Sequence, residues 1–193
     1  MALSLGMLEP CASAEAALTD RGEDAVVAAL VDGARAGDRS AFGRLYERFA
    51  PMVHGLLLAR VRWQDADDLT QEVFLTAIQR LASLRDAGAF GGWIATIARN
   101  AAVDLYRRSP ATTELPPTLG APDRPAAEAA EVLRMIRELP DAYRETLILR
   151  LVEGMSGPEI AAKTGLAAGS VRVNLHRGMK LLRDKLNGSS THA

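Results

Sequence analysis

The chain has 193 residues, of which 48% are hydrophobic and 24% charged, and this composition is typical of a folded globular protein with room for two small domains. Its net charge of −1 hides opposite blocks: residues 1–24 carry −4, residues 25–110 carry +2, residues 111–131 carry −3 and residues 132–193 carry +4. The near-zero total therefore does not exclude a nucleic-acid partner, because a partner contacts one block at a time.

Several classes of protein are disfavoured by simple features. The single cysteine, Cys11, excludes an intrachain disulfide and permits a reducing compartment. The longest apolar stretch, residues 55–59, is far shorter than the ~20 residues that span a bilayer, and the first residues lack the basic start of a signal peptide. We therefore expect a cytoplasmic protein without direct membrane insertion. His54, His176 and His192 are scattered and no Gly-rich phosphate loop is present, so we expect no enzyme, no catalytic residue, no metal and no cofactor.

The first half of the chain is predicted to be helical after an extension. Residues 1–24 are rich in alanine and acid without a lasting period, which predicts a flexible acidic extension. From residue 25 onward, apolar residues recur every three or four positions, which indicates helices and no strand. One helix is expected from an N-cap at Asp65 to about Leu84, and another runs over residues 90–108.

A change of composition separates the two halves. Residues 110–127 hold five of the nine prolines, which predicts an extended, semi-rigid linker. The helical pattern resumes over residues 128–187, before a short tail at 188–193. The predicted fold is all-α, with two helical domains joined by a Pro-rich linker.

The segment near the C-terminus has the layout of a helix-turn-helix. Ser156 and Glu159 form a capping box around Pro158, and Gly165 can end the short helix in the left-handed conformation. Residues 169–187 then hold five basic residues and one acidic residue, with apolar residues on the opposite side. In a helix-turn-helix, such a second helix enters the major groove of DNA. A solvated surface helix is the alternative; a membrane-surface helix is disfavoured because no Trp or Phe lies on its apolar side.

Two features of the first domain permit a structural or a functional interpretation. Four acids near Asp65 suit a helix N-terminus, but Asp68 and Glu72 repel each other at i,i+4 spacing, and an outward acidic face suits a basic protein partner. Phe90 and Trp93 open the next helix, which carries arginines further along. Rings that stack on bases and arginines that neutralise phosphate suit single-stranded DNA, whereas the same two rings are also typical core residues.

Three sequence blocks, in this order and spacing, carry a family resemblance. They are DADDLTQEVFL (residues 65–75), FGGWIATIARNAAVDLYRR (90–108), and the segments LPDAYRETLIL, EIAAKTG and SVRVNLHRGMKLLRDKL within residues 139–186. Over about residues 25–187 the chain resembles bacterial extracytoplasmic function (ECF) sigma factors of the sigma-70 family. The resemblance implies a sigma region 2 helical bundle at residues 25–109 and a sigma region 4 helix-turn-helix at 128–187.

The resemblance also implies partners and site residues. The first domain would bind the β′ clamp helices of core RNA polymerase and open the −10 element of promoter DNA, and the second would bind the −35 element and the β flap. The implied function is transcription initiation in a stress or envelope response, with an anti-sigma factor as a further partner. The implied polymerase-binding residues are Asp65, Asp67, Asp68, Gln71 and Glu72. The implied −10 residues are Phe90, Trp93, Arg99, Asn100, Arg107 and Arg108. The implied −35 residues are Ser170, Arg172, Val173, Asn174, His176, Arg177 and Lys180.

The chain departs from the family pattern in its recognition helix. Val173 and Asn174 stand where a small hydroxyl residue and a basic residue are common, and asparagine reads adenine whereas arginine reads guanine or phosphate. Ala167 replaces a frequent capping Ser or Thr, which removes about 1 kcal/mol of helix stabilisation. The alternative function is a stand-alone helix-turn-helix regulator, which would bind an operator tightly without polymerase, whereas a sigma factor alone would bind DNA weakly.

Overall fold

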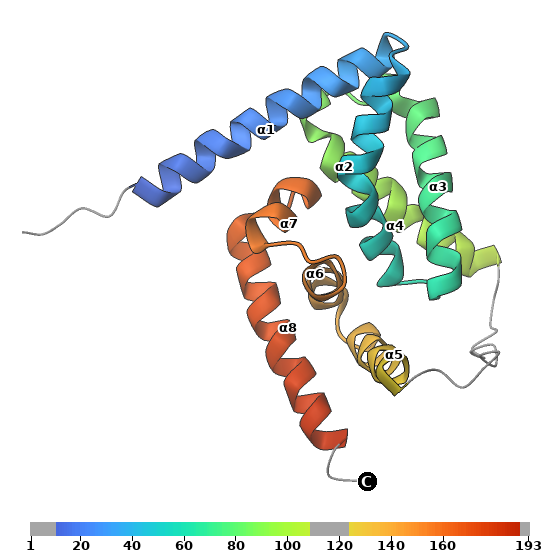
Figure 1. The fold of residues 1–193 in the computed structure, drawn as a ribbon, viewed down its shortest axis with the longest axis vertical. Coiled ribbons are helices and arrows are strands. Elements are labelled where there is room, and N and C mark those ends of the chain that lie inside the picture. Colours follow the sequence, from blue (N-terminus) through green and yellow to red (C-terminus); the bar gives the residue numbers. More distant parts are fainter. Residues whose placement is uncertain (1–10, 109–123, 190–193) are drawn as a thin grey trace, which may run out of the picture.

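The computed structural model describes residues 11–108 and 124–189, and in these ranges it contains helices and no strand (Figure 1). The α-helices are α1 (Cys11–Arg35), α2 (Arg39–Leu58), α3 (Trp63–Arg80), α4 (Phe90–Arg108), α5 (Arg124–Arg137), α6 (Asp141–Leu151), α7 (Gly157–Thr164) and α8 (Ala168–Ser189), and two 3-10 turns are η1 (Leu81–Ser83) and η2 (Ala87–Ala89). The all-α prediction is confirmed.

Two predicted segments outside the domains differ from the structure. The extension expected at residues 1–24 is helical from Cys11 onward, because its many alanines favour a helix and the later turns of α1 bury Val27 and Val31. Residues 1–10 lie outside the described residues. The linker expected at 110–127 ends earlier, since α5 begins at Arg124 and proline is tolerated in the first turn of a helix. The rest of that linker also lies outside the described residues.

Helices α1 to α4 form the first bundle. Asp38 caps α2 by accepting hydrogen bonds from the backbone N–H groups of Ser40 and Ala41. Helix α3 begins at Trp63, two residues before the predicted N-cap, so Asp65 is not the cap. Its carboxylate lies in the first turn and accepts a 2.9 Å hydrogen bond from the guanidinium of Arg62, which suits the positive end of the helix.

The helix-turn-helix is formed by α7 and α8. The Ser156 side chain accepts from the backbone N–H of Glu159, whose carboxylate accepts from the Ser156 N–H, so the predicted capping box is present. Gly165 has a φ of 73°, in the left-handed region that favours glycine, and its N–H closes the end of α7. Val171 and Leu182 of α8 are buried as expected. The second domain therefore presents the outer face of α8 to solvent.

The two halves of the chain pack directly on each other, with α6 against α2 and α7 against α4. Figure 1 shows α6 between α2 and α8. Three consecutive residues of α6, Leu147, Ile148 and Leu149, are 0% exposed, as expected for a helix that is covered on all sides. One cluster of buried apolar side chains extends through both halves. We call this packing of α6 and α7 on α2 and α4 the docked arrangement.

Backbone contacts make the docked arrangement specific. A Cβ atom at Gly91 would overlap the backbone carbonyl oxygen of Lys163, so glycine allows α4 to approach the end of α7. Arg137 donates hydrogen bonds to the carbonyl oxygens of Leu58 and Val61, at 3.0 and 2.8 Å. Carbonyl groups at and just beyond the end of α2, which have no partner within that helix, are thus satisfied by a side chain from the second half.

Candidate nucleic-acid interface

The acidic residues predicted on α3 form an exposed face. Asp67, Asp68, Gln71 and Glu72 are exposed, and Asp65 is half-buried beside Arg62. Leu69, Val73 and Phe74 of the same helix are buried in the bundle, so burial on one side directs the carboxylates outward. This face can attract a basic protein surface without any rearrangement of α3.

A groove of about 440 Å³ runs between α3 and α4. On the α3 side it is lined by Asp65, Asp68 and Glu72, and on the α4 side by Asn100 and Arg108. Residues predicted to bind polymerase and residues predicted to bind the −10 element therefore share one groove. No local pattern indicates this, because Asp65 and Arg108 are widely separated in the chain.

The two aromatic residues at the start of α4 have different environments. Phe90 is 0% exposed and packs against the rings of Phe49 and Trp93, with centroids 5.1 and 5.8 Å apart. It is a core residue of the docked arrangement, where its ring has no free face, and its contact with bases stays a prediction. Trp93 is half-buried against that core.

The polar residues of α4 are also divided. Asn100 and Arg108 are exposed in the groove, and Arg107 is exposed with its guanidinium 3.9 Å from Asp104. Arg99 instead turns toward α6 and is half-buried in an ion pair with Glu145. Three of these predicted −10 residues are thus open to solvent, whereas Arg99 is engaged within the chain.

The predicted −35 residues lie along α8. Six of them, Ser170, Arg172, Val173, His176, Arg177 and Lys180, are exposed, and Asn174 is half-buried. Val173 is 45% exposed, which leaves its side chain open for an apolar contact such as a thymine methyl group. With the inward residues buried, α8 has the geometry of a recognition helix that places side chains toward a major groove.

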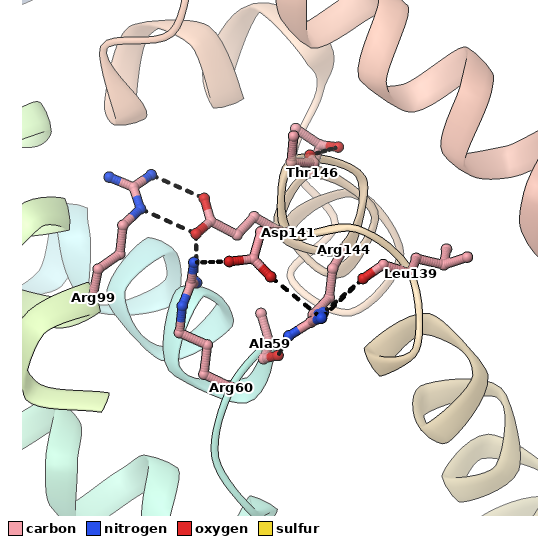
Figure 2. Close-up of polar contacts among 9 residues, drawn as sticks. Ala59, Arg60, Arg99, Leu139, Asp141, Arg144 and Thr146 are labelled. Carbon is pink, nitrogen blue, oxygen red and sulfur yellow. Dashed lines mark hydrogen bonds and ion pairs between the residues drawn. The ribbon is translucent and has the colours of Figure 1, made fainter. Parts of the chain in front are cut away.

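A buried carboxylate lies between the two halves and is not among the residues predicted from the sequence. Glu145 of α6 is buried and accepts two hydrogen bonds from Arg99, at 3.0 Å from Nε and 2.9 Å from a terminal nitrogen. Arg60, just after α2, also pairs with Glu145, and Figure 2 shows both arginines reaching toward α6. Burial alone would raise the pKa of Glu145, but its hydrogen bonds and charge interactions with Arg99 and Arg60 outweigh that effect and lower it. The sequence offers one signal of this buried carboxylate: Glu145 is a charged residue two positions before the apolar run Leu147–Leu149.

His54 forms a second polar contact between the halves. No function is predicted from the sequence for this histidine, which lies within an apolar helix. In the structure its Nδ1 atom lies 2.8 Å from the carboxylate of Glu153 in the second half. Its Nε2 atom is buried without a hydrogen bond, 3.5 Å from Asp67.

The described ranges contain no helix both long and apolar enough to cross a bilayer. In the same ranges, no three His, Cys, Asp or Glu side chains gather closely enough to hold a metal ion.

A helical bundle with an exposed acidic helix, followed by a helix-turn-helix with an exposed basic helix, defines a DNA-binding transcription protein. Comparison with known families agrees with this class. The sequence model described as "Sigma-70 region 2" matches residues 45–111, and that of "Sigma-70, region 4" matches residues 129–182. The first range begins inside α2 and includes α3 and α4, and the second runs from α5 into α8.

Individual relatives indicate which group of this family the chain resembles. The chain is 38% identical over 196 residues to the ECF RNA polymerase sigma factor SigD of Mycobacterium tuberculosis, covering 91% of this chain and 90% of SigD. It is 34% identical to the RNA polymerase sigma factor CarQ of Myxococcus xanthus, covering 79% and 92%. The solved structure of CnrH in complex with the cytosolic domain of CnrY aligns with a TM-score of 0.60 and 26% identity, covering 84% of this chain and 98% of CnrH. The chain belongs to the ECF group of the sigma-70 family. It is an RNA polymerase sigma factor, and its family consists of non-catalytic transcription initiation factors.

Proposed function

We propose that the exposed acidic face of α3 binds the β′ clamp helices of core RNA polymerase. The contact residues are Asp65, Asp67, Asp68, Gln71 and Glu72. Support comes from the exposure of four of these residues, all but half-buried Asp65, and from a like-charge arrangement that costs stability in the isolated chain and is relieved by a basic partner.

The promoter contacts are assigned to helices α4 and α8. The −10 contacts are assigned to α4, with Asn100, Arg107 and Arg108 exposed in the docked arrangement and Phe90, Trp93 and Arg99 partly or wholly covered there. The −35 contacts are assigned to Ser170, Arg172, Val173, Asn174, His176, Arg177 and Lys180 of α8, with the same domain meeting the β flap. The observation that carries the proposal is the separation of charge between an exposed acidic α3 and an exposed basic α8. One surface suits a protein and the other suits DNA.

The setting of this activity is also a proposal. The chain acts in the cytoplasm, where core polymerase is found, in a stress or envelope response, and an anti-sigma factor holds it inactive. A relevant observation is that CnrH was solved in complex with the cytosolic domain of CnrY.

Run-off transcription on a library of promoter fragments, with purified core polymerase and the full chain, tests the proposal. We expect transcripts only when both proteins are present, and weak binding of promoter duplex by the chain alone. Tight duplex binding without polymerase, together with no polymerase-dependent transcript, would instead indicate a stand-alone helix-turn-helix regulator.

A further inference from the structure

Two arginines of the first half converge on one carboxylate of the second half. Arg99 makes a two-pronged contact with Glu145, and Arg60 pairs with the same carboxylate and lies 3.4 Å from Asp141 (Figure 2). The side chain of Glu145 is 8% exposed, and those of Arg60 and Arg99 are 17% and 30% exposed. The contact is therefore well shielded from water. Charged groups in such a shielded position interact more strongly than charged groups at the protein surface.

Among the described residues, the positive charges of Arg60 and Arg99 are neutralised by the second half of the chain and not by the first half, to which both arginines belong. Every ion pair that the described residues give to Arg60 and Arg99 is made with an acid of α6. The buried terminal nitrogen of Arg60 that pairs with Glu145 makes no hydrogen bond of good geometry, so Arg60 holds this carboxylate by charge. If α6 moved away, the first half would present two adjacent guanidinium groups and no acid to neutralise them.

The geometry of the pair suits one class of ligand. A guanidinium group binds a carboxylate and a phosphate in the same two-pronged way, because both present two oxygens at a similar spacing. Arg99 also precedes Asn100 on α4, an exposed residue of the groove between α3 and α4 that is assigned to the −10 contacts. A nucleic-acid strand that follows α4 would bring a backbone phosphate toward Arg99.

We propose that Arg60 and Arg99 form a binding site for a backbone phosphate of the promoter strand, and that Glu145 occupies this site in the docked arrangement. This inference rests on the proposed function of α4. The carboxylate and the phosphate compete for the same donors, so DNA gains this contact only when α6 leaves the first half. The docked chain is consequently a weak DNA binder, and separation of the halves on the polymerase releases the site.

The test measures binding of a fluorescent, mixed-sequence single-stranded DNA of about 20 nucleotides to the full chain without polymerase. Glu145→Gln should bind about tenfold more tightly than wild type, because the amide weakens the competing contact and adds no positive side chain. Glu138→Gln is the matched control: it makes the same change of charge on an exposed residue paired with Arg134 and Lys185, and it should shift affinity by less than about twofold.

Replacing both arginines by glutamine in the Glu145→Gln chain should remove the gain in DNA affinity. It should also lower the slope of log affinity against log salt concentration by about 0.7 for each phosphate that is no longer neutralised. Gly91→Ala gives a second route, because it disturbs the contact with α7 without a change of charge, and it should also tighten binding in a manner that needs both arginines. The proposal is overturned if Glu145→Gln binds no better than Glu138→Gln, or if the gain survives replacement of both arginines. Should Glu145→Gln fail to fold by circular dichroism, the same comparison in the Gly91→Ala chain decides.

Run-off transcription separates this inference from the function on which it rests. Wild-type transcription with no gain from Glu145→Gln would overturn the phosphate site and leave the sigma function intact. Absence of wild-type transcription alongside an arginine-dependent gain would overturn the proposed promoter role of α4.

Discussion

The Nδ1 atom of His54 on α2 lies 2.8 Å from the carboxylate of Glu153 that follows α6, so a hydrogen-bonded pair joins the two halves of the chain. On its other side the imidazole faces Asp67 of α3, at 3.5 Å from Nε2, and the ring of Trp63 stands perpendicular to it. The hydrogen bond with Glu153 has the largest effect and raises the pKa of His54 above its ordinary value of 6.5, although burial opposes this.

We expect the docked arrangement to weaken as the pH rises. Because Glu153 reaches His54 only when the halves are packed, the docked form binds the proton more tightly. Its added stability is complete below the ordinary histidine pKa and is lost as the pH rises through the raised value. Energy transfer between dyes on cysteines introduced at Gln79 and Arg183, with Cys11 replaced by serine, should therefore be constant below the ordinary histidine pKa of 6.5 and fall as the pH rises above it.

Two histidine variants identify the group responsible. His54→Gln should flatten this pH profile, whereas His176→Gln, a change on the exposed face of α8, should leave it as in wild type. An equally steep profile in His54→Gln would show that another group controls the separation of the halves.

The neighbouring glycines at the start of α4 give a steric test of the docked arrangement. A Cβ at Gly91 would overlap the carbonyl oxygen of Lys163, a backbone atom that cannot turn aside, whereas a Cβ at Gly92 would lie 3.6 Å from the carbonyl oxygen of Thr164, an ordinary contact. Gly91→Ala should lower energy transfer in the dye-labelled chain and Gly92→Ala should not, although both add the same methyl group to one helix.

A Cβ at Gly91 would also approach the ring of Phe49, at 3.0 Å, within the first half. The near-ultraviolet circular dichroism of both variants, which reports on aromatic packing, should therefore be compared. Equal energy transfer in the two alanine variants would mean that α4 and α7 do not meet as the structure describes.

Local features could be predicted well from the sequence, and contacts between the halves not at all. The capping box of Ser156 and Glu159 and the left-handed Gly165 depend on neighbours within a few residues, so their residue types are sufficient to predict them. The pair His54–Glu153 joins positions 99 residues apart, and no local pattern indicates that they meet. The sequence pattern leaves Phe90 open between a core position and a base contact for the same reason, since its burial depends on Phe49 of another helix.

Charge reversal on α3 tests the polymerase contact. Asp68→Lys with Glu72→Lys should reduce capture of core polymerase by at least about tenfold, because two attractive contacts become repulsive, and circular dichroism should be unchanged because both side chains are exposed. Glu47→Lys, on the exposed side of α2, is the control for an acid-to-lysine change elsewhere on the first half, with half the change in net charge. Unchanged capture by the double variant, or an equal loss with Glu47→Lys, would remove the assigned role from α3.

The exposed arginines of α8 should determine how strongly duplex binding depends on salt. Arg172 and Arg177 are exposed on the recognition helix, and the described residues give neither an ion pair. Each duplex phosphate that the protein no longer neutralises lowers the slope of log affinity against log salt by about 0.9. Arg172→Ala with Arg177→Ala should therefore reduce the slope by about 1 if one of them binds a phosphate and by about 2 if both do, measured by fluorescence anisotropy with a mixed-sequence duplex.

An arginine outside the recognition helix provides the comparison. Arg134 of α5 is exposed but held by Glu131 and Glu138, so its charge is already neutralised and Arg134→Ala should leave the slope near the wild-type value. A residue that reads a base rather than a phosphate would behave differently again, because its removal would change sequence preference more than the salt slope. If Arg134→Ala lowers the slope as much as the double variant does, duplex binding reflects the net charge of the chain, and α8 is not its recognition helix.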